Sequence, residues 1–360
     1  MSYSKDLPYN DLPLLPPSAP VETIKILKKA ILARAALAST ASHCKRLPNE
    51  GIFYSSLFLK EAKDSSEIEN IVTTNDELFQ ALSLETENIN PNAREVLHYT
   101  KALWNGWEEM QKRGVLTTNT FIKIVNTIKE NQAGIRTNPG TKIVNQRTGT
   151  VIYTPPEGSD LIREKLKNLE VYYHADDGVD PLIKMAVGHY QFEAIHPFSD
   201  GNGRTGRIIN IIFLGLSGLL EHPMLFLSKY IIESKDEYYI RLRAITEKND
   251  WEPWILYMLD AVEKTSKYTQ EKIEGILNSM KETKEKIRKE LPGIYTKDLL
   301  EILFRQPYCK IKFLLDAGIA KRATASVYLK KLEKIGILRG VKVGREMLYV
   351  NTEFYNILKR

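Results

Sequence analysis

Twelve consecutive residues, His196–Arg207, combine the side-chain types needed to handle a phosphate group. They supply an imidazole, a carboxylate, three glycines and two guanidinium groups, and an apolar run follows at residues 208–220. Glycines leave backbone N–H groups accessible to an anion, and the N-terminus of a following helix carries partial positive charge. Arginines add fork-shaped, charge-assisted donors. This stretch is therefore predicted to be a phosphate-binding loop at the start of a helix.

Each residue type in the loop has a defined chemical use. The imidazole of His196 suits a base that takes a proton from a hydroxyl nucleophile. The carboxylate of Asp200 is a hard oxygen ligand, suited to Mg²⁺ carried by a polyphosphate. Arg204 and Arg207 would hold phosphates and stabilise charge in the transition state. The set predicts transfer of a phosphate-containing group and leaves open which phosphorus is attacked.

The same glycines also satisfy the dinucleotide-binding pattern G-x-G-x-x-G. That pattern requires a β-strand directly before the glycines. Residues 180–195 instead predict a helix, with Asp180 as N-cap and Pro181 at the first helical position. The two arginines and the preceding His-x-Phe-x-Asp are also foreign to that pattern, so we reject a Rossmann-type site.

The stretch His196-Pro-Phe-Ser-Asp-Gly-Asn-Gly-Arg-Thr-Gly-Arg207 resembles the signature H-x-F-x-[DE]-G-N-G-R-x-x-R of the Fic family, with every specified position matched. Fic enzymes mostly transfer AMP from ATP to a Ser, Thr or Tyr hydroxyl of a protein and release pyrophosphate. The resemblance implies a mainly α fold, with a helical Fic core and a β-hairpin flap. It also implies ATP as AMP donor, Mg²⁺ as cofactor and a protein hydroxyl as acceptor.

Position by position, the resemblance implies a role for each loop residue. His196 would be the general base, Phe198 the core anchor of the loop and Asp200 the Mg²⁺ ligand. Arg204 and Arg207 would clamp phosphates, with Arg207 near the γ-phosphate. Asn202 and its flanking amides would form the anion hole. The nucleotide-binding residues of the loop would be Ser199, Gly201, Asn202, Gly203, Arg204 and Arg207.

A second, shorter motif lies upstream of the loop. Residues 65–70 resemble the inhibitory pattern [ST]-x-x-x-E-[GN] of the same family, through Ser65, Glu69 and Asn70. Helical spacing puts Ser65 and Glu69 on one face. The resemblance implies that Glu69 pairs with Arg207, disturbs binding of the γ-phosphate and also serves a reverse reaction that removes AMP. A solvent-exposed helix face is the alternative for so short a pattern.

Two further stretches fit the same family. Apolar and polar residues alternate over residues 141–156 on both sides of Arg147-Thr-Gly149, which predicts a hairpin. This hairpin resembles the family's flap, whose edge can bind a target segment as an added strand and so fix its position. An ordinary surface hairpin is the alternative. Residues 236–239 resemble the border of the adenine, so we expect Tyr239 to pack on the base and Ile143 of the flap to close the same pocket. A partly buried core tyrosine is the alternative for Tyr239.

Composition and length are those of an ordinary globular chain. Of 360 residues, 43% are hydrophobic and 27% charged, enough for two or three domains. Cys44 and Cys309 lack metal-binding spacing and give no disulfide framework, which favours a reducing cytoplasm. The N-terminus shows no apolar signal segment. Residues 208–220 are too short to span a bilayer and predict a buried central helix.

The chain is predicted to divide into four parts. Residues 1–90 form an N-terminal helical region with the inhibitory motif, and residues 91–262 form the catalytic core, with Trp251-Glu-Pro-Trp254 as core and turn. Residues 263–290 form a connecting helix. Residues 291–360 are predicted to be a winged helix-turn-helix domain.

The last 70 residues carry the positive charge of the chain. They hold fourteen Lys or Arg against six Asp or Glu, whereas the whole chain is only +6. Three helical patterns followed by two strands resemble a winged helix: residues 296–304, 311–317, 324–335, 337–343 and 347–350. DNA binding would use Thr324, Ser326, Lys330, Lys331 and Lys334 of the third helix, with Arg345 at the wing tip. The third helix offers few base-reading side chains, so a protein partner is the alternative.

Two functional classes follow from these observations. The first is an AMP-transferase whose tail recruits a target or sets assembly. The second is a DNA-binding regulator that uses the Fic fold as a nucleotide sensor. The intact base, carboxylate and arginines favour the enzyme, and a donor other than ATP stays open. The expected partners are ATP, a hydroxyl of a target protein or of this chain, and a second copy in a homodimer; DNA is a candidate and a membrane is not expected.

Overall fold

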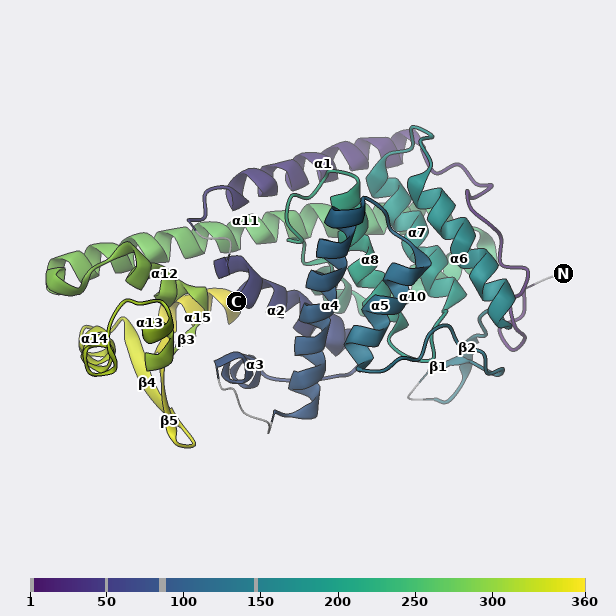
Figure 1. The fold of residues 1–360 in the computed structure, drawn as a ribbon. Helices are drawn as coiled ribbons and strands as arrows, with labels where there is room; N and C mark the ends of the chain where they lie inside the picture. The colour runs from purple at the N-terminus through teal and green to yellow at the C-terminus, as the bar shows by residue number, and fades with distance from the viewer. Residues whose placement is uncertain (1–2, 49–50, 84–88, 146–147, 360) are drawn as a thin grey trace. The chain divides into compact units, whose positions relative to one another are not determined.

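The computed structural model describes residues 3–48, 51–83, 89–145 and 148–359, with only the backbone of residues 51–56 (Figure 1). These ranges are mainly helical, with one two-stranded and one three-stranded antiparallel sheet, which confirms the predicted fold class. The chain divides into two compact units. The first comprises Met1–Ala41, Asp64–Asn70 and His98–Lys267, and the second comprises Ser42–Lys63, Ile71–Leu97 and Tyr268–Arg360.

The centre of the first unit is a pair of helices, α7 (Pro181–Ile195) and α8 (Asn202–Leu216), which pack against each other (Figure 1). Helix α6 (Ser159–His174) packs on α7, and α5 (Thr118–Lys129) packs on α8. Nearly every residue of α7 and α8 is buried, as was expected for the apolar run that begins at Ile208. The predicted N-cap is confirmed, because the side chain of Asp180 accepts a hydrogen bond from Leu182 N.

The position of the central helix differs from the prediction over residues 208–220. Helix α8 begins six residues earlier, inside the glycine loop, and ends at Leu216. Close packing explains one of its glycines: a Cβ on Gly215 would collide with the ring of Trp107. Gly218 has φ +70°, a left-handed conformation that ends the helix instead of continuing it.

A short hairpin of β1 (Ile143–Val144) and β2 (Val151–Tyr153) precedes α6, as predicted, and pairs Ile143 with Tyr153. Arg147 of the predicted turn lies outside the described residues. The N-terminal segment lies along the base of this hairpin, where Tyr9 N donates to Thr154 O (3.0 Å). Lys165 of α6 continues this attachment by donating to Leu12 O (2.7 Å).

The remaining helices with residues in the first unit are α1 (Ile24–Cys44), α2 (Gly51–Ile68), α4 (Pro91–Arg113), α9 (Leu227–Glu233), α10 (Lys235–Lys248) and α11 (Trp251–Glu290). Helices α1, α2, α4 and α11 contribute residues to both units. The predicted connecting helix is therefore the second part of α11 rather than a separate element. Residues 251–254 were predicted as core and turn. Trp251 and Trp254 are buried as expected, but the predicted turn is wrong, because these residues form the start of helix α11.

Within the described ranges, no helix is both long and apolar enough to cross a membrane.

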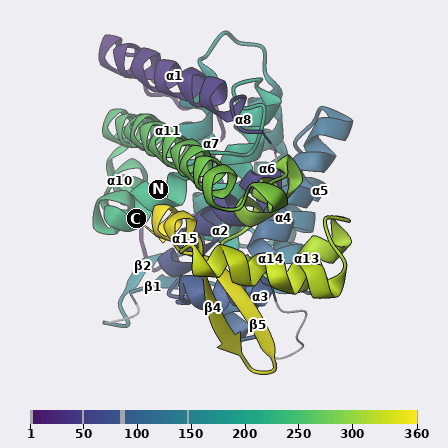
Figure 2. The ribbon, with the colours of Figure 1, turned by 90° about the vertical axis from the view of Figure 1, so that its left-hand side faces the viewer.

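The second unit contains the winged-helix order predicted from the sequence, together with α3 (Asn75–Ser83) (Figure 2). Its C-terminal elements are η1 (Pro292–Ile294), α12 (Lys297–Arg305), β3 (Tyr308–Cys309), α13 (Ile311–Asp316), α14 (Arg322–Lys334), β4 (Leu338–Val343), β5 (Glu346–Asn351) and α15 (Thr352–Lys359). The sheet order is β3-β5-β4. Strand β3 and helix α15 were not predicted from the sequence. A strand of two residues is too short to show a hydrophobic pattern, and the last helix has only eight residues.

The winged-helix elements are not packed only on one another. Tyr308 on β3 donates to Asp76 Oδ1 of α3 (2.7 Å), and Gln306 donates to Ser83 Oγ (3.2 Å). Lys272, in the second part of α11, donates to Ile357 O of α15 (2.6 Å). The unit thus joins the C-terminal domain with earlier segments, and the predicted domain boundaries stay predictions.

Candidate active site

Two residues with left-handed backbone conformations shape the loop between α7 and α8. His196 ends α7 at φ +47° and donates its N–H to Phe192 O (3.0 Å). Gly201 precedes α8 at φ +81°, a conformation that glycine adopts at little cost. The loop places the first N–H groups of α8 beside the histidine turn, which is the arrangement predicted for an anion.

The loop is anchored in the core through Phe198 and Asn202. Phe198 is buried and lies against Phe192, with ring centroids 6.2 Å apart. The Asn202 side chain closes the loop by donating to Phe198 O (2.7 Å) and accepting from Phe198 N (2.8 Å). The amide oxygen and one of the two amide hydrogens are therefore engaged inside the loop. The second amide hydrogen and the backbone N–H of Asn202 are its donors for an anion.

The imidazole of His196 is held in its neutral form. Burial lowers the pKa of His196 to about 4, and the nearby guanidinium of Arg136 lowers it further. Glu69, the backbone of Glu193 and Asp200 act in the opposite direction. A neutral imidazole is the form that accepts a proton, so the side chain is ready to act as a base at neutral pH.

Asp200 lies at the exposed side of the loop and already contacts cations. Its Oδ2 is 2.6 Å from Lys129 Nζ, and its Oδ1 accepts from Gly201 N (2.6 Å) and Arg204 Nη2 (3.5 Å). Burial alone would raise the pKa of Asp200, but the hydrogen bond and charge of Lys129 hold the pKa below its usual value. The carboxylate is 60% exposed and could supply one oxygen ligand to Mg²⁺.

No group of three or more His, Cys, Asp or Glu that could hold a metal occurs in the part of the chain described. Binding of Mg²⁺ by Asp200 stays a prediction.

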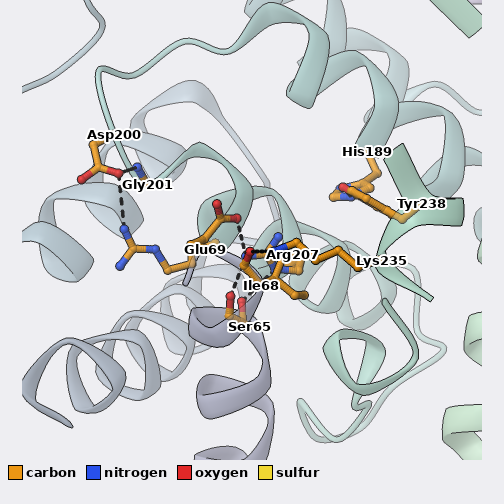
Figure 3. A network of polar contacts seen from close by, with 10 residues as sticks. Ser65, Ile68, Glu69, His189, Asp200, Gly201, Arg207, Lys235 and Tyr238 are labelled. Atoms are coloured by element: carbon orange, nitrogen blue, oxygen red, sulfur yellow. Dashed lines mark hydrogen bonds and ion pairs between the residues drawn. The ribbon is translucent and has the colours of Figure 1, made fainter. Parts of the chain in front are cut away.

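Arg207 joins the loop to the segment at residues 65–70 (Figure 3). It is 1% exposed, and it donates from Nε to Ser65 Oγ (2.8 Å) and from Nη2 to Ser65 O (2.8 Å) and Glu69 Oε1 (2.9 Å). Burial alone would lower the pKa of Arg207, but the carboxylate of Glu69 raises it above its usual value. The structure thus brings together two motifs that lie more than a hundred residues apart. Ser65 lies on α2, and Glu69 lies just beyond the last residue of that helix.

The carboxylate of Glu69 lies directly against the first turn of α8. A Cβ added to Gly203 would collide with Glu69 Oε1, so only glycine permits this approach. The end of α2 is held a second time by Lys235 of α10, whose Nζ donates to Ile68 O (2.6 Å; Figure 3). Glu69 therefore occupies the place at the helix N-terminus where an anion is expected.

Two buried ionisable residues behind the loop were missed by the sequence analysis. Burial raises the pKa of Glu193 to about 8, and its Oε1 is buried without a hydrogen-bond partner among the described residues. Burial, with Arg207, lowers the pKa of His189 to about 3, and its Nε2 is 2.8 Å from the hydroxyl of Tyr238 (Figure 3). The only available signal was the position of Glu193, three residues before His196 on a predicted helix.

Arg136 is a third residue near the loop that the sequence motifs did not predict. Its side chain is buried and donates from Nε to His196 O (2.8 Å) and from Nη2 to Pro156 O. Its backbone N–H donates to Pro197 O (3.0 Å). It therefore touches the backbone on both sides of the histidine turn.

The remaining predicted residues lie at the edges of this arrangement. Tyr239 is 44% exposed, yet burial of its hydroxyl end, with Glu69 nearby, raises its pKa. Arg207 acts on the same hydroxyl, so Tyr239 lies near the Glu69–Arg207 pair. Ile143 is partly exposed on β1, and Ser199 is exposed in the loop. Their contacts with a nucleotide stay predictions.

Three family models match successive parts of the chain. The Fic/DOC family N-terminal model matches residues 27–108, and the Fic/DOC family model matches residues 115–214. The model of the protein adenylyltransferase SoFic-like C-terminal domain matches residues 279–354.

Curated relatives match over a shorter region. Protein adenylyltransferase fic-1 of Caenorhabditis elegans is 27% identical over 134 residues, which are 37% of this chain and 24% of that protein. Protein adenylyltransferase Fic of Culex quinquefasciatus is 30% identical over 115 residues, which are 31% of this chain and 21% of that protein. The aligned region thus spans less than a quarter of the length of these relatives.

Two solved structures share the fold over most of the chain. A Fic family protein from Desulfovibrio desulfuricans G20 has a TM-score of 0.61 at 16% identity, over 93% of this chain and 98% of that one. Fic-1 from Caenorhabditis elegans has a TM-score of 0.52 at 17% identity, over 71% of this chain and 74% of that one. At these identities the likeness concerns the fold alone.

Proposed function

Because the chain belongs to the Fic/DOC family, we propose that it transfers AMP from ATP to a Ser, Thr or Tyr hydroxyl of a protein. The observation that carries the proposal is the loop between α7 and α8. There, a neutral imidazole, an exposed carboxylate and two arginines surround the first turn of one helix. The names of the curated relatives, all protein adenylyltransferases, support the same activity.

The proposed reaction uses the chain's own groups for proton transfer and charge stabilisation. His196 takes the proton from the acceptor hydroxyl while its oxygen attacks the α-phosphorus of ATP. The bond between the α-phosphorus and the bridging oxygen breaks, and pyrophosphate leaves with the electron pair. Arg204, Arg207 and the first N–H groups of α8 stabilise the developing charge. Mg²⁺ bound by Asp200 and the triphosphate would neutralise part of the charge on the leaving group.

We propose that Glu69 inhibits this reaction. Its carboxylate lies where the N-terminus of α8 would receive a phosphate, and it engages a guanidinium that the triphosphate also needs. A triphosphate entering the site would meet a like charge and a partly neutralised arginine, so basal transfer should be slow. With a modified protein in the site, the same carboxylate could orient a water molecule for removal of AMP.

Intact mass spectrometry after incubation with ATP and Mg²⁺ tests the proposal. The proteins are wild type, Glu69→Gly, and Glu69→Gly combined with His196→Ala. We expect addition of one AMP to Glu69→Gly, less to wild type and none to the double variant. If Glu69→Gly gains no AMP, the same incubation in a cell lysate with a labelled ATP analogue separates a target supplied in trans from an inactive protein. Absence of label there would overturn the proposed activity.

The winged-helix region supports a second candidate function, binding of duplex DNA. Its exposed cations, for which the structure records no ion pair within the described chain, are Lys321, Arg322, Lys330, Lys331, Lys334, Arg339, Lys342 and Arg345. Lys321 directly precedes α14, and the others lie on α14 and on the β4–β5 hairpin, two elements labelled in Figure 2. Contacts from such residues to phosphates would make binding weaken steeply with added salt.

Fluorescence anisotropy with a labelled random duplex, at several salt concentrations, tests this candidate. Combined Lys330→Gln and Lys334→Gln should weaken binding and flatten its salt dependence. No binding at low salt would leave a protein partner as the use of this surface. The expected homodimer and the self-modification stay predictions.

A further inference from the structure

We propose that Arg136 is a positioning residue for AMP transfer, which holds the turn of the catalytic base and the exit of the flap hairpin in one fixed arrangement. The flap is the hairpin formed by β1 and β2. The inference rests on the proposed function for the reaction it serves. Its structural part, the arrangement of three chain segments around one guanidinium, can be tested without any transfer activity.

The contacts of Arg136 connect three segments that are separate in the sequence. Its side chain is only 7% exposed. Its Nε donates to His196 O (2.8 Å), and its Nη2 donates to Pro156 O and, at 3.4 Å, to Ile195 O. Its own N–H donates to Pro197 O (3.0 Å). One residue therefore binds the carbonyl groups of three consecutive residues around the base, and one carbonyl at the end of the hairpin.

The turn at His196 requires such support. A non-glycine residue at φ +47° lies in a conformation that is intrinsically unfavourable and persists only when its surroundings fix it. Arg136 binds the carbonyl of His196 itself and of both neighbours, so it fixes the peptide planes on each side of the turn. The direction in which the imidazole leaves the backbone then follows from this geometry.

The hairpin is tied to the same turn. Pro156 follows β2 by three residues, and Tyr153 of β2 donates its hydroxyl hydrogen to Ala194 O (2.8 Å). The exit of the flap is thus attached twice to the last turn of α7. A target strand that paired with the flap would be placed at a fixed position relative to His196, and orientation of this kind contributes strongly to rate.

The charge of Arg136 adds an electrostatic consequence. The charged groups that act on the imidazole are Arg136 from the segment before the flap, Glu69 from the end of α2 and Asp200 from the loop; the backbone of Glu193 in α7 also acts on it. Arg136 is the cation among them and disfavours a protonated imidazole. Lysine would keep this charge, but it cannot reproduce the planar fork that reaches several carbonyls.

The test compares Arg136→Gln and Arg136→Lys with Arg163→Gln, an exposed arginine of α6 in the same unit. All are made in the Glu69→Gly protein. The first readout is NMR titration of ¹³C-labelled histidines, with the His196 signal assigned by its loss in His196→Ala. The second readout is the rate of AMP addition at saturating ATP, together with ATP affinity measured by calorimetry.

We expect Arg136→Gln to raise the titration midpoint of His196 by about one unit and to slow AMP addition about 100-fold. ATP affinity should change less than twofold. Arg136→Lys should keep the titration near that of the parent while still slowing AMP addition, and Arg163→Gln should change neither. This split between titration and rate is not expected from general loss of stability, which circular dichroism melting would show separately.

The proposal is overturned if both Arg136 variants match Arg163→Gln in titration and in rate. If Arg136→Gln does not fold, Arg136→Lys alone decides, because a normal rate in that variant removes the need for the fork. If the Glu69→Gly parent adds no AMP, the proposed activity fails. The histidine titration would then still decide whether Arg136 sets the environment of His196.

Discussion

The loop between α7 and α8 and the winged-helix region both concentrate positive charge, but they hold it in opposite ways. Arg204, Arg207 and Arg136 are almost fully buried, and the structure gives each of them an acceptor. The cations of α14 and the β4–β5 hairpin are exposed and have no recorded ion pair in the described ranges. Removing one partner of a buried ion pair typically costs about 3–5 kcal/mol, whereas an exposed pair contributes about 0–1 kcal/mol.

This difference separates two kinds of recognition. Buried and oriented donors are arranged before the ligand arrives, so they favour one anion in one position. Exposed lysines on flexible stems attract any polyanion and lose that attraction in salt. Substitution of the buried arginines should therefore change both chemistry and folding, and substitution of the exposed cations should change only association.

The largest expected effect is that of His196→Ala in the Glu69→Gly protein. Loss of a general base typically slows a reaction about 10²–10⁴-fold, so AMP addition should become undetectable by mass spectrometry. The melting temperature should stay close to that of the parent, because the left-handed turn is fixed by backbone contacts. Persistent AMP addition would assign the base to another residue.

The next effect is that of Glu69→Gly, which should raise the rate of AMP addition and tighten ATP binding. Glu69→Gln is the matched control, since it keeps the shape of the side chain but removes the charge facing the triphosphate. An intermediate rate for Glu69→Gln would show that both charge and volume inhibit. Equal rates for wild type and Glu69→Gly at saturating ATP would refute inhibition by Glu69.

Lys235→Met should release the inhibitory segment in part. Its Nζ holds Ile68 O at the end of α2, next to Glu69, without contacting the loop in the recorded hydrogen bonds. We expect a severalfold increase in AMP addition for Lys235→Met alone, and no further increase when it is combined with Glu69→Gly. Additive effects in the double variant would contradict a shared mechanism.

Glu193→Gln should change the pH dependence of stability. Burial raises the pKa of Glu193 from 4.5 to about 8, so the folded protein binds this proton more tightly than the unfolded chain. The wild type should therefore lose stability as pH rises from about 4.5 to about 8, and Glu193→Gln should remove that loss. Thermal melts at several pH values measure the difference, and parallel curves for the two proteins would contradict a buried neutral carboxyl group.

The smallest effect is expected in the winged-helix region. Exposed substitutions away from special contacts usually change stability by less than about 0.5 kcal/mol. Lys330→Gln combined with Lys334→Gln should therefore leave the melting temperature and the rate of AMP addition unchanged. A lower rate of addition would show that this surface serves the reaction and not only association.

Local patterns explain which elements were predictable. The N-cap of α7 and the order of the three helices and two strands predicted after residue 291 depend on neighbouring residues, and the structure has them as expected. The first residues of helices α8 and α11 were not predicted correctly. Helix α8 starts inside the loop because Asn202 bonds back to Phe198, and α11 runs without a break because its tryptophans are buried in its first turns.

The sequence by itself determined the chemical groups of the loop and of residues 65–70, because their spacing within each motif is fixed by a few backbone dihedrals. Only the tertiary structure decided which distant groups meet them: Arg136, Lys129, Glu193 and Lys235. None of these four belongs to a motif. Their positions follow from how α5, α7, α10 and the segment before the flap pack around α8, and such packing depends on burial across the whole unit rather than on local spacing.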